Sequence, residues 1–148
     1  MGKRVGWRDV VGEAGQGGRV LIVEDQVEVR RSLQRLVIQL GYSVRVAGSA
    51  EEADLWLQSE PFDVCLLDVE LPRMQGVEFL TWALGRDPEL AIIMITGLNL
   101  PELAIECIDA GARTYLVKPV ESEFLRLALR DAVAVRSLLV ERNRRASS

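Results

Sequence analysis

Short apolar runs alternate with amphipathic segments along most of the chain. Apolar residues dominate 20–23, 64–67, 91–95 and 115–117, and a β-rich stretch covers 43–47. Runs this short, without polar alternation, are typical of parallel strands buried on both faces. Between them, apolar residues recur at intervals of three and four, which predicts helices. The pattern predicts an α/β fold: a doubly wound parallel sheet of five strands with five helices covering both of its faces.

Local signals mark where several of these helices begin and end. The first helix is expected to stop at Gly41, because glycine readily adopts the left-handed conformation after a helix. Ser49 can cap the second helix, and Pro101 fits the first turn of the fourth. The last helix is expected to begin near Glu121 and to reach about Arg142.

The 148 residues suit one ordinary domain. Residues 1–18 are rich in glycine and show no sustained periodicity, so we interpret them as a flexible leader. The domain itself is predicted at 19–136, and 137–148 are interpreted as a helix extension and tail. Hydrophobic residues make up 49% of the chain, which is enough for a core.

Composition and charge exclude several classes of function. The net charge of -4 argues against direct nucleic-acid binding, and the lack of a long apolar run argues against a membrane span. No signal peptide is evident, so a cytoplasmic location is expected. Cys65 and Cys107 lie in apolar stretches and are interpreted as reduced core thiols. The chain has no histidine, which excludes phosphohistidine chemistry within it.

The residues that carry chemistry fall at the carboxyl ends of the predicted strands, where such sheets bind ligands. They are Glu24 and Asp25 after the first strand, Asp68 after the third, Thr96 after the fourth and Lys118 after the fifth. Three neighbouring carboxylates repel one another, and a hard divalent cation such as Mg²⁺ would offset that repulsion. A carboxylate nucleophile, a metal, a lysine and a hydroxyl together indicate a phosphoryl-transfer site.

The same positions lie in four short motifs, which read LIVED at 21–25, LDVELPRMQG at 67–76, ITG at 95–97 and VKP at 117–119. Over about 19–134, the chain resembles the receiver domain of bacterial two-component response regulators. The resemblance implies a flavodoxin-like sheet of order 2-1-3-4-5. It also implies that Asp68 is the phosphoacceptor and that Glu24, Asp25, Asp68 and the backbone carbonyl of Glu70 bind Mg²⁺. In most relatives the acidic pair is Asp-Asp, so Glu24 is a conservative departure.

The resemblance further assigns Thr96 and Lys118 to the phosphoryl oxygens and predicts a cis peptide between Lys118 and Pro119. Tyr115 matches the aromatic switch residue, which turns inward when Thr96 moves, although a plain core aromatic is an equally good interpretation of it. The predicted function is to take a phosphoryl group from a histidine kinase or phosphotransfer protein and to switch a partner or output module. Such a domain catalyses only its own phosphorylation and dephosphorylation, so we do not expect an enzyme.

Two other functions are alternatives to this one. A degenerate receiver would serve only as a protein-binding scaffold. A phosphatase of the haloacid-dehalogenase type also forms an aspartyl phosphate, but places its nucleophile after the first strand in an Asp-x-Asp motif, whereas here Asp68-Val69-Glu70 follows the third. Singly, each site residue also has a plainer interpretation: Glu24 and Asp25 could cap the next helix, and Lys118 could be a solvated turn residue.

The last helix carries a heptad-like seam of Leu125, Ala128, Ala132, Val135 and Leu139. A second stripe, which contains Leu129 and Val133, could pack on the sheet. Either the helix packs on its own domain, or it projects and carries the signal onward. We expect that a homodimer, if one forms, uses the face of the fourth helix, fifth strand and fifth helix, or the C-terminal helix itself.

Overall fold

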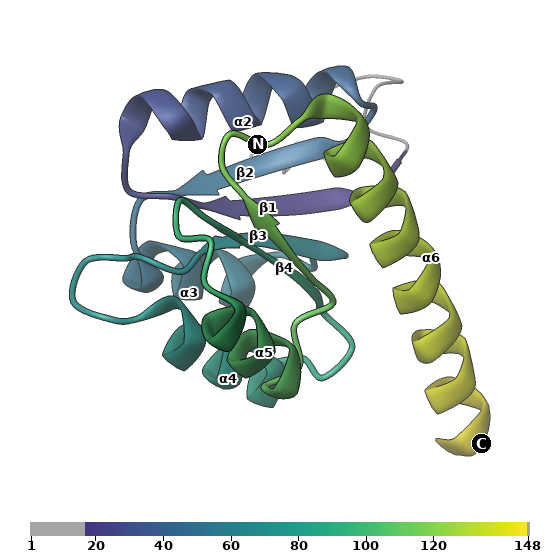
Figure 1. Ribbon diagram of the computed structural model, residues 1–148. Coiled ribbons are helices and arrows are strands. Elements are labelled where there is room, and N and C mark those ends of the chain that lie inside the picture. Colours follow the sequence, from purple (N-terminus) through teal and green to yellow (C-terminus); the bar gives the residue numbers. More distant parts are fainter. Residues whose placement is uncertain (1–16, 148) are drawn as a thin grey trace, which may run out of the picture.

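The computed structural model describes residues 17–147, and these form a three-layer α/β domain (Figure 1). A parallel sheet of five strands has the order β2-β1-β3-β4-β5. The strands are β1 (Arg19–Val23), β2 (Ser43–Ala47), β3 (Val64–Asp68), β4 (Ala91–Thr96) and β5 (Thr114–Val117). The doubly wound sheet and its strand order are therefore confirmed.

Helices cover both faces of the sheet. Figure 1 shows α2 and α6 on one face and α3, α4 and α5 on the other. Their bounds are α2 (Val27–Gln39), α3 (Ala50–Ser59), α4 (Gly76–Arg86), α5 (Pro101–Asp109) and α6 (Ser122–Ser147). Because successive side chains of a strand point to opposite faces, the sheet supports two cores. Val20 and Ile22 pack toward α2 and α6, and Leu21 and Val23 toward the other helices.

The expected helix boundaries are present. Gly41 follows α2 with φ 103, the left-handed conformation that favours glycine. The Ser49 hydroxyl accepts a hydrogen bond of 3.2 Å from the amide of Glu52 and caps α3. Pro101 lies in the first turn of α5. Ser49 and Pro101 mark helix starts at the carboxyl edge of the sheet, whereas Gly41 lies at the opposite edge, where α2 leads into β2.

The two ends of the domain differ from the prediction. Of the expected leader, residues 1–16 lie outside the described part, but the amide of Gly17 donates to the carbonyl of Gly41 at 2.8 Å. The carbonyl of Gly18 likewise accepts from the amide of Ser43 at 2.9 Å. Residues 17 and 18 are thus hydrogen-bonded to the domain. At the other end, α6 begins at Ser122 and continues to Ser147, beyond the expected end at Arg142.

The first half of α6 packs on its own domain. Leu125, Leu129 and Ala132 are all at most 1% exposed, so members of both predicted stripes are buried in the same core. Further along, Arg136 lies 3.4 Å from the carboxylate of Asp63 and donates to Asp87 at 3.1 Å. A heptad-like seam and a core-facing stripe have the same spacing of three and four residues. In this helix the first half of the seam packs into the core of its own domain.

Two further expectations concern the whole domain. Cys65 and Cys107 are both buried and free, as expected for core thiols. Burial raises the pKa of the Cys65 thiol to about 12, which makes it a poor nucleophile.

Within residues 17–147, no helix is both long and apolar enough to cross a membrane.

Candidate functional site

The carboxyl edge of the sheet brings the predicted acidic residues together. Strands β1 and β3 are adjacent and in register, with Val23 opposite Leu67, so the residues that follow meet at the same edge. One carboxylate oxygen from each of Glu24, Asp25 and Asp68 lies within 4.8 Å of the others. Glu24 and Asp68 are buried, whereas Asp25 is exposed at the mouth of the cluster.

Asp68 is the last residue of β3, and both of its carboxylate oxygens are engaged. Its side chain is 5% exposed. Oδ1 accepts a hydrogen bond from the amide of Glu70 at 2.9 Å, and Oδ2 accepts one from Lys118 Nζ at 3.1 Å. The carboxylate is therefore held at the sheet edge by an amide on one side and an ammonium on the other, with its remaining lone pairs available to a ligand.

Glu24 is the most deeply buried of the acidic residues, at 1% exposure. Its Oε1 accepts a hydrogen bond from Lys118 Nζ at 2.5 Å, and its Oε2 accepts one from the amide of Gln26 at 3.1 Å. Burial raises the pKa of Glu24 to about 7, and the ion pair with Lys118 only partly offsets this effect. Gln26 occupies the N-cap of α2 and makes no side-chain cap, so Asp25 is not the capping residue of that helix.

Lys118 joins the two buried carboxylates. Its ammonium contacts both Glu24 and Asp68, and its side chain is 23% exposed. Burial lowers the pKa of Lys118, but the bonds to the two carboxylates more than compensate, and the net pKa is raised. Lys118 thus carries a positive charge at neutral pH. The peptide bond to Pro119 is cis, as expected.

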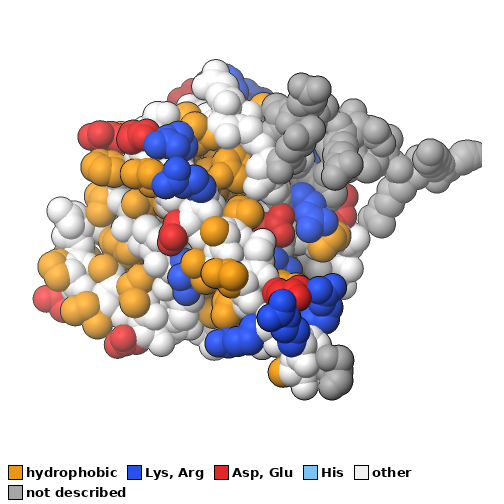
Figure 2. Space-filling model, turned by 90° about the vertical axis from the view of Figure 1, so that its right-hand side faces the viewer, with side chains coloured by type: hydrophobic (Ala, Val, Ile, Leu, Met, Phe, Trp, Pro, Cys, Tyr) orange, Lys and Arg blue, Asp and Glu red, His pale blue; other side chains and the backbone are white. Residues whose placement is uncertain are grey.

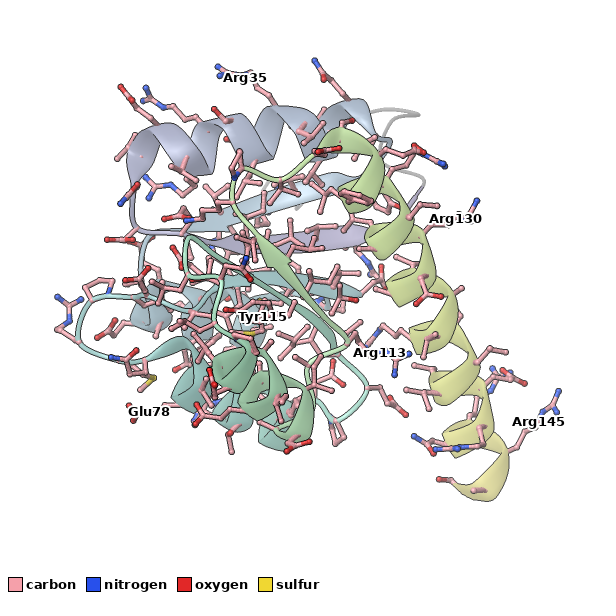
Figure 3. All side chains as sticks on the ribbon, in the orientation of Figure 1. Arg35, Glu78, Arg113, Tyr115, Arg130 and Arg145 are labelled. Atoms are coloured by element: carbon pink, nitrogen blue, oxygen red, sulfur yellow. The ribbon has the colours of Figure 1, made fainter. Side chains whose placement is uncertain are left out.

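Thr96 and Tyr115 lie on neighbouring strands at the same edge. Thr96 is fully buried, and its hydroxyl accepts a hydrogen bond of 3.1 Å from the amide of Leu98. The Tyr115 ring packs against the core on the α5 side of the sheet (Figure 3). Its hydroxyl donates to the carbonyl of Leu98 at 2.7 Å. Both side chains therefore hold the same residue of the β4–α5 loop, which gives Thr96 and Tyr115 a shared point of contact.

Glu70 and Arg30 complete the surroundings of the site. The Glu70 amide bonds to Asp68, while its own side chain is exposed. Arg30 was not predicted as part of the site; its Nη1 donates to the backbone carbonyl of Glu24 at 2.9 Å. An arginine on the polar face of an amphipathic helix is common, so nothing in the pattern distinguishes this one.

The fold and the acidic cluster define the class: a doubly wound α/β domain with a buried carboxylate beside a lysine at the strand ends. A family model described as "Response regulator receiver domain" matches residues 20–130. The chain therefore belongs to the receiver domains of response regulators. This confirms the resemblance drawn from the four sequence motifs.

Individual relatives agree with this assignment. The chain is 36% identical over 121 residues to the alginate biosynthesis transcriptional regulatory protein AlgB of Pseudomonas syringae pv. tomato, covering 82% of this chain and 27% of AlgB. It is 34% identical over 125 residues to a cyclic di-GMP phosphodiesterase of Thermotoga maritima, covering 84% of this chain and 33% of that one.

Solved structures show the same fold. A CheY-like receiver domain from Methanospirillum hungatei superimposes with a TM-score of 0.76 at 31% identity, covering 80% of this chain and 95% of that one. The chain spans about a quarter to a third of the length of the curated relatives named above. The similarity is thus to the receiver portion of longer proteins.

Proposed function

We propose that this domain accepts a phosphoryl group on Asp68 and that the modification switches its signalling state. The observation that carries the proposal is the contact of Lys118 with the carboxylate of Asp68, next to two further carboxylates. Asp68 supplies a nucleophilic oxygen, and Lys118 supplies a cation beside the position that a transferred phosphoryl group would take. The complete set of site residues at one sheet edge speaks against a degenerate receiver that serves only as a scaffold.

The acidic cluster fits a magnesium ion. Its donors are all oxygen atoms, and three carboxylates with one ammonium leave an excess of negative charge. Glu24, Asp25 and Asp68 would hold the ion, and the backbone carbonyl of Glu70 is a further predicted ligand. When bound, Mg²⁺ would neutralise the charge of the phosphoryl oxygens.

The phosphoryl donor must be another molecule, since this chain has no histidine. We propose phosphohistidine on a kinase or phosphotransfer protein as the donor. An oxygen of Asp68 forms a bond to phosphorus as the P–N bond breaks, and the electron pair of that bond stays on the imidazole nitrogen. Dephosphorylation is a separate step: water attacks phosphorus, the O–P bond breaks with its electron pair left on the Asp68 carboxylate, and inorganic phosphate leaves as the water gives up a proton to solvent.

The switch would work through Thr96 and Tyr115. A phosphoryl group on Asp68 adds strong hydrogen-bond acceptors beside Lys118, and the Thr96 hydroxyl can turn from the Leu98 amide to donate to them. Leu98 also holds the Tyr115 hydroxyl, so its displacement frees that ring to turn inward. Added charge of this size is sufficient to bias a two-state loop.

The surface that this switch would change includes α5, β5 and the start of α6. Exposed apolar side chains lie there, among them Leu100, Ile105, Ile108, Phe124 and Leu127. Figure 2 shows hydrophobic side chains spread over this side of the molecule, with basic ones near the C-terminal end of α6. We propose that this face binds a second copy of the domain or an output module.

We also propose that the domain spans residues 19–136 and functions in the cytoplasm.

The output is a separate question. One relative is named as a transcriptional regulator and another as a cyclic di-GMP phosphodiesterase, so similar receivers occur in proteins with different names and outputs. We propose that this domain itself turns over no external metabolite and acts only through the module or partner that reads its state.

Incubation with a small-molecule phosphodonor and Mg²⁺, followed by intact mass, tests the proposal. We expect one added phosphoryl group on the natural protein, none on Asp68→Asn and none with EDTA present. The control Asp109→Asn alters an exposed acid at the end of α5 and should be phosphorylated normally. Equal uptake by Asp68→Asn would overturn the proposal, and turnover of a phosphomonoester would favour a phosphatase instead.

A further inference from the structure

Arg30 lies on α2 and reaches back to the loop that carries the acidic pair. Its Nη1 donates to the carbonyl of Glu24 at 2.9 Å and lies 3.5 Å from the carbonyl of Asp25. The contacts are to the backbone of the two residues and not to their carboxylates. Arg30 therefore fixes the path of the loop and leaves the acidic side chains available to a cation.

The guanidinium lies close to Gly48, the residue that follows β2. A Cβ added to Gly48 would lie 3.0 Å from Arg30 Nη1 and 3.5 Å from Glu52 Oε1. The side chain of Arg30 thus passes close over Gly48, on the same side as Glu52 in the first turn of α3. A residue larger than glycine at 48 would crowd the guanidinium. Arg30 consequently lies between the β1–α2 loop, to which it bonds, and the start of the loop that follows β2.

Asp25 depends on this backbone more than the other acids do. Glu24 and Asp68 are both bonded to Lys118, which fixes their carboxylates. For Asp25, within residues 17–147, no side chain donates a hydrogen bond to the carboxylate, and the residue is exposed. The position of its oxygen atoms is therefore set by the backbone of the loop, and Arg30 donates its hydrogen bond to that backbone.

We propose that Arg30 is a positioning residue for the divalent cation: it orders the loop of Glu24 and Asp25 so that three carboxylates meet within reach of one ion. The inference rests on the proposed function, since it assumes that the cluster binds Mg²⁺. Arg30 would act through the backbone of the loop, since its contacts there are to the carbonyls of Glu24 and Asp25. Groups that orient metal ligands in this way commonly change metal affinity 10- to 100-fold when they are removed.

Charge and geometry make opposite predictions for the loss of Arg30. Removing a positive charge near three carboxylates should strengthen the binding of a cation by Coulomb attraction alone. Removing the bonds to the loop should weaken it, because the carboxylates must then be ordered when the ion binds. The sign of the change in affinity therefore separates a positioning role from a purely electrostatic effect.

Calorimetric titration of the full chain with MgCl₂ tests the proposal. We expect Arg30→Met to bind Mg²⁺ roughly tenfold more weakly than the natural protein. Arg31→Met removes the same charge from the exposed neighbouring position of α2 and should bind normally. The Mg²⁺ affinity of Arg30→Lys, which keeps a single donor group, should lie between those of Arg30→Met and Arg31→Met. Unchanged or tighter binding by Arg30→Met overturns the proposal.

A second measurement needs no metal. In EDTA, amide hydrogen exchange at Gln26, whose amide bonds to Glu24 Oε2 at 3.1 Å, should be faster in Arg30→Met than in Arg31→Met. Equal exchange in the two variants contradicts the proposed ordering of the loop, and urea unfolding checks that both variants are folded. If the natural protein itself shows no Mg²⁺ binding, the proposed function fails together with this inference. If the natural protein binds Mg²⁺ and Arg30→Met binds it equally well or more tightly, only the inference about Arg30 is overturned.

Discussion

The substitution Glu24→Gln should stabilise the metal-free protein at pH 8 and have a much smaller effect at pH 5. Glu24 is 1% exposed, and its burial raises the pKa to about 7 from a value of 4.5 for a solvated glutamate. Ionised Glu24 therefore opposes folding in the absence of a metal. Glutamine has nearly the same shape, carries no charge and can still accept the hydrogen bond from Lys118.

The sign of the pH dependence follows from proton binding. Between pH 4.5 and about 7, Glu24 binds more protons in the folded state than in the unfolded state, so stability falls as the pH rises through this range. A tenfold difference in proton affinity corresponds to about 1.4 kcal/mol, so the separation of the two pKa values means that ionised Glu24 lowers the free energy of unfolding by about 3 kcal/mol at pH 8. At pH 5 the same calculation gives a loss of stability of about 1 kcal/mol or less.

Urea unfolding in EDTA at pH 5 and pH 8 measures this effect. The stability gained by Glu24→Gln over the natural protein should be about 2–3 kcal/mol larger at pH 8 than at pH 5. The control Glu28→Gln changes an exposed acid in the first turn of α2 and should show no such difference. A Glu24→Gln protein that is less stable at pH 8, or whose gain does not vary with pH, would refute the reasoning.

Three further predictions concern packing within the domain. Gly76→Ala should destabilise the protein and slow phosphorylation, because the new Cβ would lie 2.5 Å from the carbonyl oxygen of Asp68. Its control, Gly85→Ala, lies in the same helix with open space around it and should stabilise the protein by about 0.5–1 kcal/mol in urea unfolding. Leu125→Ala should lower the free energy of unfolding by about 2–5 kcal/mol and Leu138→Ala by less than about 0.5 kcal/mol, since the two side chains are 0% and 70% exposed. Similar losses of stability for the two variants in thermal unfolding would show that α6 does not pack as described. Arg136→Met should lower stability by about 1–3 kcal/mol at pH 7, because two carboxylates lose their shared cation, and an unchanged urea midpoint would contradict this.

Much of the architecture could be predicted from the sequence because burial on both faces leaves a clear pattern. Short apolar runs separated by helical spacing predict a parallel sheet, and the strand order came from the resemblance of the motifs. The convergence of Glu24, Asp68 and Lys118 could also be anticipated, because the carboxyl ends of parallel strands meet at one edge. Such predictions depend on topology alone.

What could not be predicted depends on side-chain reach in three dimensions. Nothing in the motif shows that Lys118 lies closer to Glu24 than to Asp68, at 2.5 Å and 3.1 Å. The seam of α6 was ambiguous, because packing on the domain and packing on a partner need the same spacing. Arg30 was missed for a related reason: its partners are backbone carbonyls, which every residue has.

The central claim is that Asp68 carries the phosphoryl group. Borohydride reduction of the phosphorylated protein, followed by peptide mass mapping, reports the modified residue directly, since it converts an aspartyl phosphate to homoserine. We expect homoserine at position 68, only in samples that received both Mg²⁺ and the phosphodonor. Homoserine at another aspartate, or a phosphorylated protein with an intact aspartate at 68, would contradict the account.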